Sequence, residues 1–350
     1  MRCSRTCFYV PSTELVDAVP PSISQYWAWI DEVARTLPAK LANDEGDCTR
    51  VGPYNWTVQT FIYLRDAGFP CELSASVPEE GIIITHGDFL PRSFAPSARQ
   101  FLVEIKPDRE LQCRFANFVI VQNRHDPIRY GLRRLLVPAA FVHFWPQPGL
   151  LGREESRADT FENVCFIGNS EEFLPGVEVL AAEIRKLGLH WRMVPREHWH
   201  DYRQVDAVVA VRPRPARWSR RRNEDPSSDP NRKPASKLLN AWRAGVPAVL
   251  SPDIAFGDLR RSELDYLEAR DVPEIILRLK RLKDDAALRR SMAANGTRRA
   301  ADYTAEHNAR AWQNLIQREI GPRFASWVRS PWRRKWFYFA RARMLTLNVR

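Results

Sequence analysis

Residues 231–251 read NRKPASKLLNAWRAGVPAVLS, and this stretch decides the fold. Pro234 suits the first turn of a helix because its missing N–H would lack a partner there, and Gly245 suits a left-handed stop after the helix. The apolar run at 246–250 then has the length and composition of a strand that helices cover on both faces. The stretch therefore predicts a polar loop, a helix of about ten residues and a strand of a parallel sheet.

The amino end of this predicted helix is a candidate phosphate site. N–H groups without helical partners and the positive end of the helix dipole meet there, and Lys233 and Lys237 add two ammonium groups within a turn. Lys237, Asn240 and two alanines recur at i, i+3, i+4 and i+7 on one face, where small residues let a ligand approach closely. The alternative interpretation is an amphipathic surface helix whose lysines are only solvated.

The same stretch resembles the donor-binding segment of GT-B glycosyltransferases, especially those of family 4. There, a Leu-Leu-Glu-Ala core runs into Ala-Gly-x-Pro-Val-Val, whereas residues 238–241 here read Leu-Leu-Asn-Ala and 244–249 read Ala-Gly-Val-Pro-Ala-Val. That family often carries two glutamates eight positions apart, the second of which holds the ribose of the nucleotide. Arg232 and Asn240 stand at these positions, so an uncharged amide would have to hydrogen-bond the ribose.

Length, charge and cysteines restrict the class of protein. A chain of 350 residues exceeds the usual size of a single core, so two domains are expected. The 53 basic and 42 acidic residues give a net charge of +11, but residues 321–350 contain eight basic residues and no acidic one. The rest of the chain is nearly neutral, and no nucleic-acid partner is expected. Six scattered cysteines without a C-x-x-C pair indicate neither a zinc site nor a disulfide scaffold.

The tail at 321–350 has a composition of its own. Between its basic residues stand seven aromatic ones: Phe324, Trp327, Trp332, Trp336, Phe337, Tyr338 and Phe339. No stretch of the chain approaches a membrane span, so we expect a cytoplasmic protein. The tail's apolar anchors and cations predict a peripheral position at the inner face of the membrane, beside a lipid-linked acceptor. The alternative is that the tail packs across the first domain, as the last helix of GT-B enzymes tends to do.

The first half of the chain is predicted to be the acceptor side. Residues 52–73 predict a loop, a helix ended by Gly68 and a short strand, and this helix resembles the first helix of the family, which normally follows a Gly-Gly loop. Here Gly52 is followed by a proline, and the resemblance implies acceptor-side contacts for Gly52 and Asn55. Further strands are predicted at 7–10, 71–73, 101–105, 115–123 and 139–145, and a further helix at 25–37.

His86 and Asp88 are the candidate catalytic residues of this half. They follow a buried strand predicted at 81–85, and ligands of doubly wound sheets gather at the carboxyl ends of strands. The His-x-Asp pattern also resembles an acceptor-side segment of the same glycosyltransferases. Either side chain is therefore a candidate general base for the acceptor hydroxyl if the sugar is transferred with inversion. The alternative is a histidine that only caps a turn.

The second half repeats the strand–loop–helix opening of a nucleotide-binding fold. A strand predicted at 163–167 leads into Gly168 and Asn169, and a helix at 177–187 follows. The phosphate-binding lysine of the family has no counterpart here, because Pro-Gly stands in its place at 175–176. We therefore expect the pyrophosphate charge to be held by Arg212, Lys233 and Lys237. Further strands are predicted at 190–194 and 207–212, and further helices at 273–282, 286–303 and 306–316.

These features predict two Rossmann-like α/β domains of GT-B type that face a central cleft. The acceptor domain is expected at 1–150, with an insertion at about 11–50, and the donor domain at 151–320. The basic aromatic segment at 321–350 completes the chain. The polar, arginine-rich loop at 213–232 is a candidate lid over the donor, and a solvated loop is the alternative.

The resemblance implies transfer of a sugar from a nucleotide-sugar donor to a glycan or lipid-linked acceptor in cell-surface glycan biosynthesis. Donor contacts are expected from Gly168, Asn169, Arg212, Lys233, Ser236, Lys237 and Asn240. No Asp-x-Asp occurs, so cations and helix N-termini are expected to replace a metal at the departing diphosphate. No cofactor is expected either, since the nucleotide sugar is a substrate. Two alternatives stay open, namely a nucleotide-sugar epimerase or hydrolase of the same fold and a nucleic-acid-binding protein without enzymatic activity.

Overall fold

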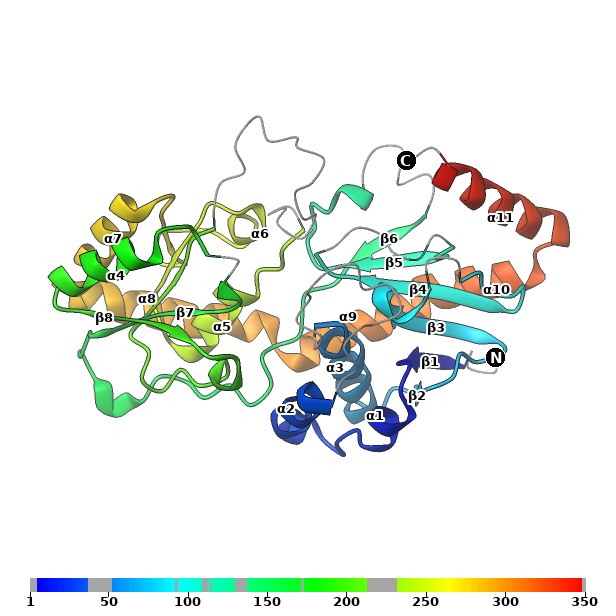
Figure 1. Cartoon of the computed structure of the whole chain (residues 1–350), viewed down its shortest axis with the longest axis horizontal. Helices are drawn as coiled ribbons and strands as arrows, with labels where there is room; N and C mark the ends of the chain where they lie inside the picture. Colours follow the sequence, from blue (N-terminus) through cyan, green and yellow to red (C-terminus); the bar gives the residue numbers. More distant parts are fainter. Residues whose placement is uncertain are drawn as a thin grey trace. The chain divides into compact units, whose positions relative to one another are not determined.

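The computed structural model describes residues 5–36, 52–91, 94–108, 113, 115–129, 137–170, 173–212 and 232–347. Two compact units divide the chain: unit 1 comprises Met1–Trp145 together with Ala305–Arg350, and unit 2 comprises Pro146–Thr304 (Figure 1). The sequence predicts residues 305–320 in the second domain, whereas the structure has them in unit 1. The candidate lid lies outside the described residues except for Arg232.

Unit 1 contains a six-stranded sheet in the order β2-β1-β3-β4-β5-β6, in which all neighbouring strands are parallel. Its strands are β1 (Thr6–Tyr9), β2 (Glu72–Ser74), β3 (Gly81–His86), β4 (Gln100–Lys106), β5 (Phe118–Val121) and β6 (Ala139–Phe141). Strands β3 and β4 are buried along their whole length, which explains the apolar runs Ile82–Ile84 and Phe101–Val103 in them.

Both faces of this sheet are covered. Leu102 and Val103, neighbours in β4, belong to two different apolar cores, because successive side chains of a strand point to opposite faces. The larger core combines α3 (Gly52–Asp66) with α9 (Ala305–Leu315), which comes from the later part of the chain. The other helical elements of unit 1 are α1 (Thr13–Asp17), α2 (Tyr26–Thr36), a π-helical turn (Ile316–Ile320), α10 (Gly321–Arg329) and α11 (Trp332–Leu347). Among the described residues, no helix has the length and apolarity needed to cross a bilayer.

Unit 2 contains a five-stranded parallel sheet in the order β11-β10-β9-β7-β8. Its strands are β7 (Asn163–Ile167), β8 (His190–Val194), β9 (Ala207–Ala210), β10 (Ala248–Leu250) and β11 (Leu267–Glu268). Its helices are α4 (Val177–Lys186), α5 (Ser236–Ala244), α6 (Ile254–Gly257), α7 (Val272–Asp284) and α8 (Ala286–Ala300). The two Rossmann-like sheets confirm the predicted fold class, while the central cleft stays a prediction.

Each sheet has one point where the strand order reverses. In unit 1 this point lies between β1 and β3, and in unit 2 it lies between β7 and β9. At this point, the chain segments that follow the two adjacent strands run to opposite sides of the sheet. Ligands of doubly wound sheets bind beyond the carboxyl ends of these two strands. The fold therefore marks one ligand position in each unit, independently of any motif.

The stretch that decides the fold forms the elements that its sequence predicts. Helix α5 ends at Gly245, whose φ of 66° is left-handed, and the Gly245 N–H donates to the carbonyl of Trp242. Pro234 stands two residues before the helix instead of inside its first turn. Strand β10 begins at Ala248, two residues later than predicted, because Pro247 has no N–H to give to the ladder.

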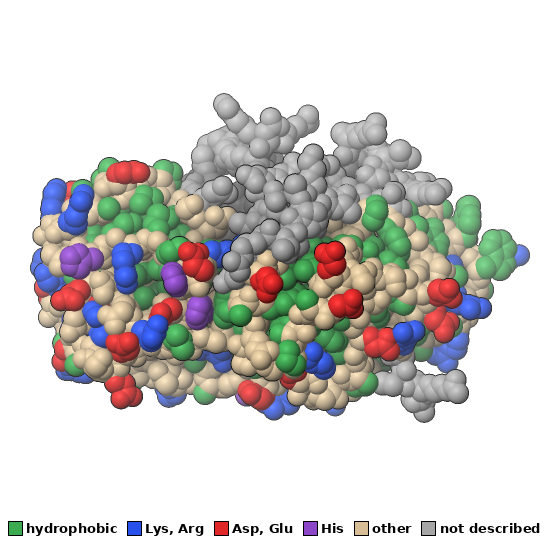
Figure 2. Space-filling model, turned by 60° about the horizontal axis from the view of Figure 1, so that its bottom comes forward, with side chains coloured by type: hydrophobic (Ala, Val, Ile, Leu, Met, Phe, Trp, Pro, Cys, Tyr) green, Lys and Arg blue, Asp and Glu red, His purple; other side chains and the backbone are tan. Residues whose placement is uncertain are grey.

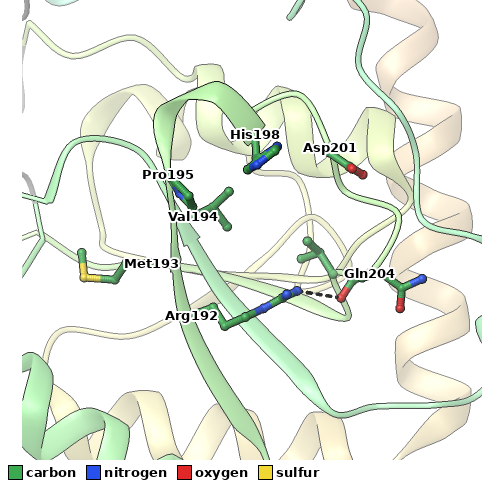
Figure 3. Close-up of a pocket in the computed structure, with 8 residues that line it drawn as sticks. Arg192, Met193, Val194, Pro195, His198, Asp201 and Gln204 are labelled. Atoms are coloured by element: carbon green, nitrogen blue, oxygen red, sulfur yellow. Dashed lines mark hydrogen bonds between the residues drawn. The ribbon is translucent and has the colours of Figure 1, made fainter.

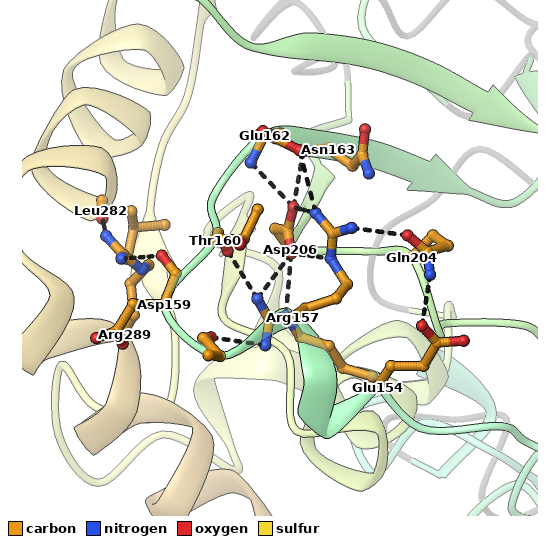
Figure 4. Close-up of polar contacts among 12 residues, drawn as sticks. Glu154, Arg157, Asp159, Thr160, Glu162, Asn163, Gln204, Asp206, Leu282 and Arg289 are labelled. Atoms are coloured by element: carbon orange, nitrogen blue, oxygen red, sulfur yellow. Dashed lines mark hydrogen bonds and ion pairs between the residues drawn. The ribbon is translucent and has the colours of Figure 1, made fainter.

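Asp206 fixes the beginning of unit 2 to its sheet (Figure 4). Its carboxylate accepts hydrogen bonds from Nε of Arg153 at 3.0 Å, from Nε of Arg157 at 2.8 Å and from two backbone N–H groups beside β7. Burial opposes the charge, but these hydrogen bonds outweigh it and hold the pKa of Asp206 below its usual range. Residues 152–160 have the charged composition of a linker. The structure explains this composition, because arginines of the segment form ion pairs with Asp206 and hold the segment on the sheet.

Candidate functional site

The predicted donor residues gather at the strand ends of unit 2 where the strand order reverses. Gly168 and Asn169 directly follow β7, and Arg212 follows β9, the neighbour of β7 in the sheet. Helix α5 begins after the loop from β9, so its first turn, with Ser236 and Lys237, starts at the same edge of the sheet. The structure therefore brings three separate segments of the sequence to the position that the topology marks.

One contact joins two of these segments closely. A Cβ atom placed on Gly168 would lie 2.7 Å from Lys237 Cε and 2.9 Å from its Nζ, so a side chain there would displace the lysine. The ammonium lies 5.5 Å from the ring centre of Phe166, within cation–π range. The N-cap residue Ala235 has no side-chain acceptor for the first-turn N–H groups of α5. A cation, a glycine and a helix N-terminus without a side-chain cap thus meet at one place, as an anion site requires.

Arg212 and Lys233 are both largely enclosed by the protein. Arg212 Nη1 forms an ion pair with Asp253, and only 10% of the arginine side chain is exposed. Its guanidinium also lies 5.7 Å from the ring centre of Phe256. Lys233 is buried, with 5% of its surface exposed. Arg212 and Lys233 are largely enclosed, whereas Lys237 is half-buried, so Lys237 is the most exposed of the three cations at this edge of the sheet.

Asn240 takes part in hydrogen bonds within unit 2. Its Nδ2 lies 3.4 Å from Oε1 of Gln147, and it also bonds the hydroxyl of Tyr202, whose pKa is raised by burial. An amide side chain offers two donors and an acceptor with two lone pairs, so these contacts leave capacity for a ribose hydroxyl. The sequence pattern contains no signal for Gln147 or Tyr202, because both come from segments distant from α5.

A pocket that the sequence does not predict lies along β8 in unit 2. It has a volume of about 280 Å³ and is lined by Arg192, Met193, Val194, Pro195, His198, Asp201, Gln204 and Val205 (Figure 3). In the sheet register, Val194 is the partner of Ile167, the residue before Gly168. From there the pocket extends to Gln204 and Val205, which precede β9 at the amino edge of the sheet. The only signal in the sequence is the polar run after β8, which contains His198 and Asp201.

The predicted catalytic residues of unit 1 lie where its strand order reverses. His86 ends β3, and Asp88 lies in the 3₁₀ turn Gly87–Phe89 that follows. Both are buried, with 3% and 2% of their surfaces exposed. The N–H of Asp88 donates to Nδ1 of His86 at 3.1 Å, and this nitrogen lies 3.6 Å from Oδ2 of Asp88. The histidine thus caps the turn, as the alternative interpretation has it.

The environment of His86 makes it a weak base. Burial lowers its pKa to about 3, so the imidazole is neutral at pH 7. Because Nδ1 accepts the Asp88 N–H, the ring hydrogen lies on Nε2, and that nitrogen donates. A base must have a lone pair free to take the proton, and His86 has none, because Nδ1 accepts the Asp88 N–H and Nε2 carries the ring hydrogen. Of the two candidates, Asp88 therefore suits the role of general base better than His86.

The acceptor-side residues Gly52 and Asn55 belong to the first turn of α3. Gly52 is its first residue, so the predicted loop is a helix start. Asn55 accepts a hydrogen bond from the hydroxyl of Tyr26 in α2. Tyr54 packs against Phe89 with ring centres 4.8 Å apart, so this helix start contacts the turn that carries Asp88. The structure brings Gly52, Asn55 and Asp88 together through two aromatic residues that sequence reasoning does not select.

The chain is similar to several solved structures over most of its length. HepE of Anabaena, in complex with UDP and glucose, is 13% identical with a TM-score of 0.49 and is matched over 90% of this chain and 100% of HepE. Sucrose-phosphate synthase from Thermosynechococcus elongatus is 13% identical with a TM-score of 0.49, over 91% of this chain and 100% of the synthase. No protein-family model matches the sequence, and no curated protein does. Likenesses at these identities and scores do not bear on the ligands of this chain.

Proposed function

We propose that the chain is a glycosyltransferase that uses a nucleotide-sugar donor. The contact between Lys237 and Gly168 at the start of α5 carries this proposal. When the sugar leaves, negative charge grows on the nucleoside diphosphate, and a fixed cation together with backbone N–H groups stabilises that charge in the transition state.

The proposed transfer needs no divalent metal. In the described ranges of the chain, no group of three or more His, Cys, Asp or Glu side chains is arranged to hold a metal ion. Asp253, the carboxylate beside Arg212, is engaged in an ion pair. We therefore assign to Lys237 and the N-terminus of α5 the part that a metal plays in other transferases.

The acceptor side of the proposal rests on unit 1. Asp88 lies at the strand-order reversal, in contact with the start of α3, and would take the proton of the attacking hydroxyl if the reaction inverts the anomeric centre. If the reaction retains it, the leaving phosphate takes that proton. The acceptor in this proposal is a glycan or lipid-linked acceptor of the cell surface, and the enzyme works in the cytoplasm at the inner face of the membrane.

Release of nucleoside diphosphate from a panel of nucleotide sugars tests the activity. We expect release with one donor that rises strongly when an acceptor glycan is added and is unchanged by a chelator. Equal release with and without acceptor would indicate a hydrolase, and interconversion of the sugar without release would indicate an epimerase. Loss of turnover with chelator, restored by manganese, would overturn the metal-independent mechanism.

A further inference from the structure

The C-terminal helices α10 and α11 are held firmly on unit 1 by one face. Trp327 is buried in the larger core of unit 1, and Tyr338 and Phe339 pack against that core. The Tyr338 hydroxyl donates to the carbonyl of Ala116 at 2.6 Å, and Nζ of Lys335 donates to the carbonyl of Ala98 at 3.1 Å. The sequence left open whether the tail binds a membrane or packs across the first domain. For the face of α10 and α11 that carries Trp327, Tyr338 and Phe339, packing on unit 1 is confirmed.

The opposite face exposes large aromatic side chains. Trp332, Trp336 and Phe337 are 71%, 59% and 66% exposed, and among the described residues no other Trp, Phe or Tyr is exposed. Trp332 and Trp336 are neighbours at i and i+4 on α11, and Phe337 lies about 100° further round the helix, so the three rings occupy a broad exposed face. Val328, at the end of α10, is 45% exposed and extends the apolar surface. Three aromatic rings in water on one helix face are a signature of an interaction site.

The charge on α10 and α11 themselves has a single sign. Residues 321–347 contain seven basic side chains and no acidic one. Arg329, Arg333 and Arg334 are exposed, and the guanidinium of Arg333 lies 5.8 Å from the ring centre of Trp332. Elsewhere the signs are mixed, and the face in Figure 2 shows acidic and basic side chains interspersed. The helices that carry the exposed rings thus have no acidic side chain of their own to pair with these arginines, and their charge is complementary to an anionic surface.

We propose that this face, formed by Val328, Trp332, Trp336 and Phe337 with Arg329, Arg333 and Arg334, rests on an anionic lipid bilayer. Tryptophan and phenylalanine rings insert at the boundary between head groups and acyl chains, and nearby cations are attracted to anionic lipid. A surface that combines exposed rings with cations suits a bilayer, which offers both an apolar layer and a negative charge. We call these seven residues the lipid face.

The position of the lipid face in unit 1 also limits the acceptor, if the proposed function holds. Lys335 and Tyr338 bind carbonyls just before β4 and β5, so α11 lies at the amino edge of the sheet. Asp88 lies beyond the carboxyl end of β3. A strand of seven residues such as β4 spans about 20 Å, so the two regions lie at opposite edges of the sheet. The acceptor is then a glycan that extends away from the membrane, instead of a sugar held directly at the head groups.

Sedimentation of the full-length protein with vesicles tests the lipid face without any nucleotide sugar, so the result is independent of the proposed activity. We expect binding to vesicles of phosphatidylcholine with phosphatidylglycerol, weaker as salt rises, and little binding to phosphatidylcholine alone. Changing Trp332, Trp336 and Phe337 together to serine should reduce binding about tenfold or more. The matched control changes Val179 and Leu277, both 58% exposed on helices of unit 2, to serine and should bind like the parent.

Two outcomes would overturn the proposal. The full-length protein could stay in the supernatant at low salt, or the triple serine variant could bind as the parent does, which would indicate a general site for polyanions. The thermal midpoint of the triple variant should equal that of the parent, because the changed side chains are exposed. A chain cut after Pro322 is no substitute, since it would remove Trp327 and expose the core of unit 1.

Discussion

The two ligand positions of this molecule differ in what holds them together. In unit 2, the candidate donor site is assembled from separate segments, and the contact between Lys237 and Gly168 joins α5 to the turn after β7. In unit 1, the candidate catalytic residues form one local turn, in which His86 caps the N–H of Asp88. The donor side therefore presents a cation on a half-buried helix start, whereas the acceptor side presents a buried, neutral imidazole and a carboxylate.

The difference teaches that strand topology and side-chain chemistry carry separate information. Both sites lie where the strand order of a parallel sheet reverses, so topology alone marks them. Topology does not distinguish a residue that binds a ligand from one that stabilises the turn. That distinction depends on burial and hydrogen-bond direction, and the following variants test it.

The largest effect is expected from the carboxylate of unit 1. Asp88→Asn should lower kcat about a thousandfold if Asp88 is the general base, whereas His86→Gln should stay within about tenfold of the parent. Steady-state kinetics with saturating donor and acceptor measure both, with the donor KM and the thermal midpoint as controls. Equal losses in the two variants would show that the turn as a whole matters. Near-parent activity of Asp88→Asn would indicate that the leaving phosphate takes the proton.

The second effect concerns the cation of unit 2. Lys237→Ala should lower kcat about a hundredfold, the scale of losing one group aimed at a developing anion. Gly168→Ala should act in the same direction, because its Cβ would occupy the place of the lysine side chain. Arg243→Ala in the last turn of α5 is the matched control and should stay within about threefold. If Lys237→Ala turns over like the parent, α5 is only a surface helix.

The third effect is on stability in acid. The pKa of His86 is about 3 in the folded protein and 6.5 in its ordinary state, so between these values the unfolded chain holds a proton that the folded one lacks. Lowering the pH therefore favours unfolding, by about 1.4 kcal/mol per unit, or about 3 kcal/mol at pH 4.5. His86→Gln removes this contribution. Urea unfolding at pH 7 and pH 4.5 should show a smaller acid loss in the variant, and an equal loss would contradict the buried neutral histidine.

The smallest effect is expected at the ribose position. Asn240→Ala should raise the donor KM about tenfold, the loss of roughly one hydrogen bond, and leave kcat nearly unchanged. Initial rates over a range of donor concentrations measure the two constants separately. A fall in kcat at constant KM would instead show that Asn240 stabilises the transition state, either directly or by positioning Tyr202 and Gln147.

Much of the fold is predictable because its signals are local. Gly68, Gly188 and Gly245 all have positive φ, and each ends a helix that the sequence predicts. The apolar runs give the central strands, which are buried on both faces. The division of the chain is less predictable, because the return of α9 to unit 1 depends on contacts between residues far apart in the sequence.

The candidate site is predictable only in its own segments. The spacing of Lys237 and Asn240 along a helix face is visible in the sequence, and so is the position of Gly168 after a strand. The ion pair of Arg212 with Asp253 is not visible, because its partner follows another strand, and it changes the availability of a predicted cation. The tail shows the same limit, since its aromatic residues separate into buried and exposed ones only once α11 is docked on the sheet.

The route of the chain through unit 1 has a consequence for its synthesis. The core that contains Phe8 and Tyr54 also contains Trp312, Ile320 and Trp327, which are translated after the whole of unit 2. Unit 2 is continuous, so it can complete its fold on the ribosome while unit 1 still exposes apolar surface to chaperones. Protease treatment of stalled nascent chains should accordingly release a resistant fragment of unit 2 before any from unit 1. Protection of unit 1 before residues 305–327 emerge would show that its core closes without them.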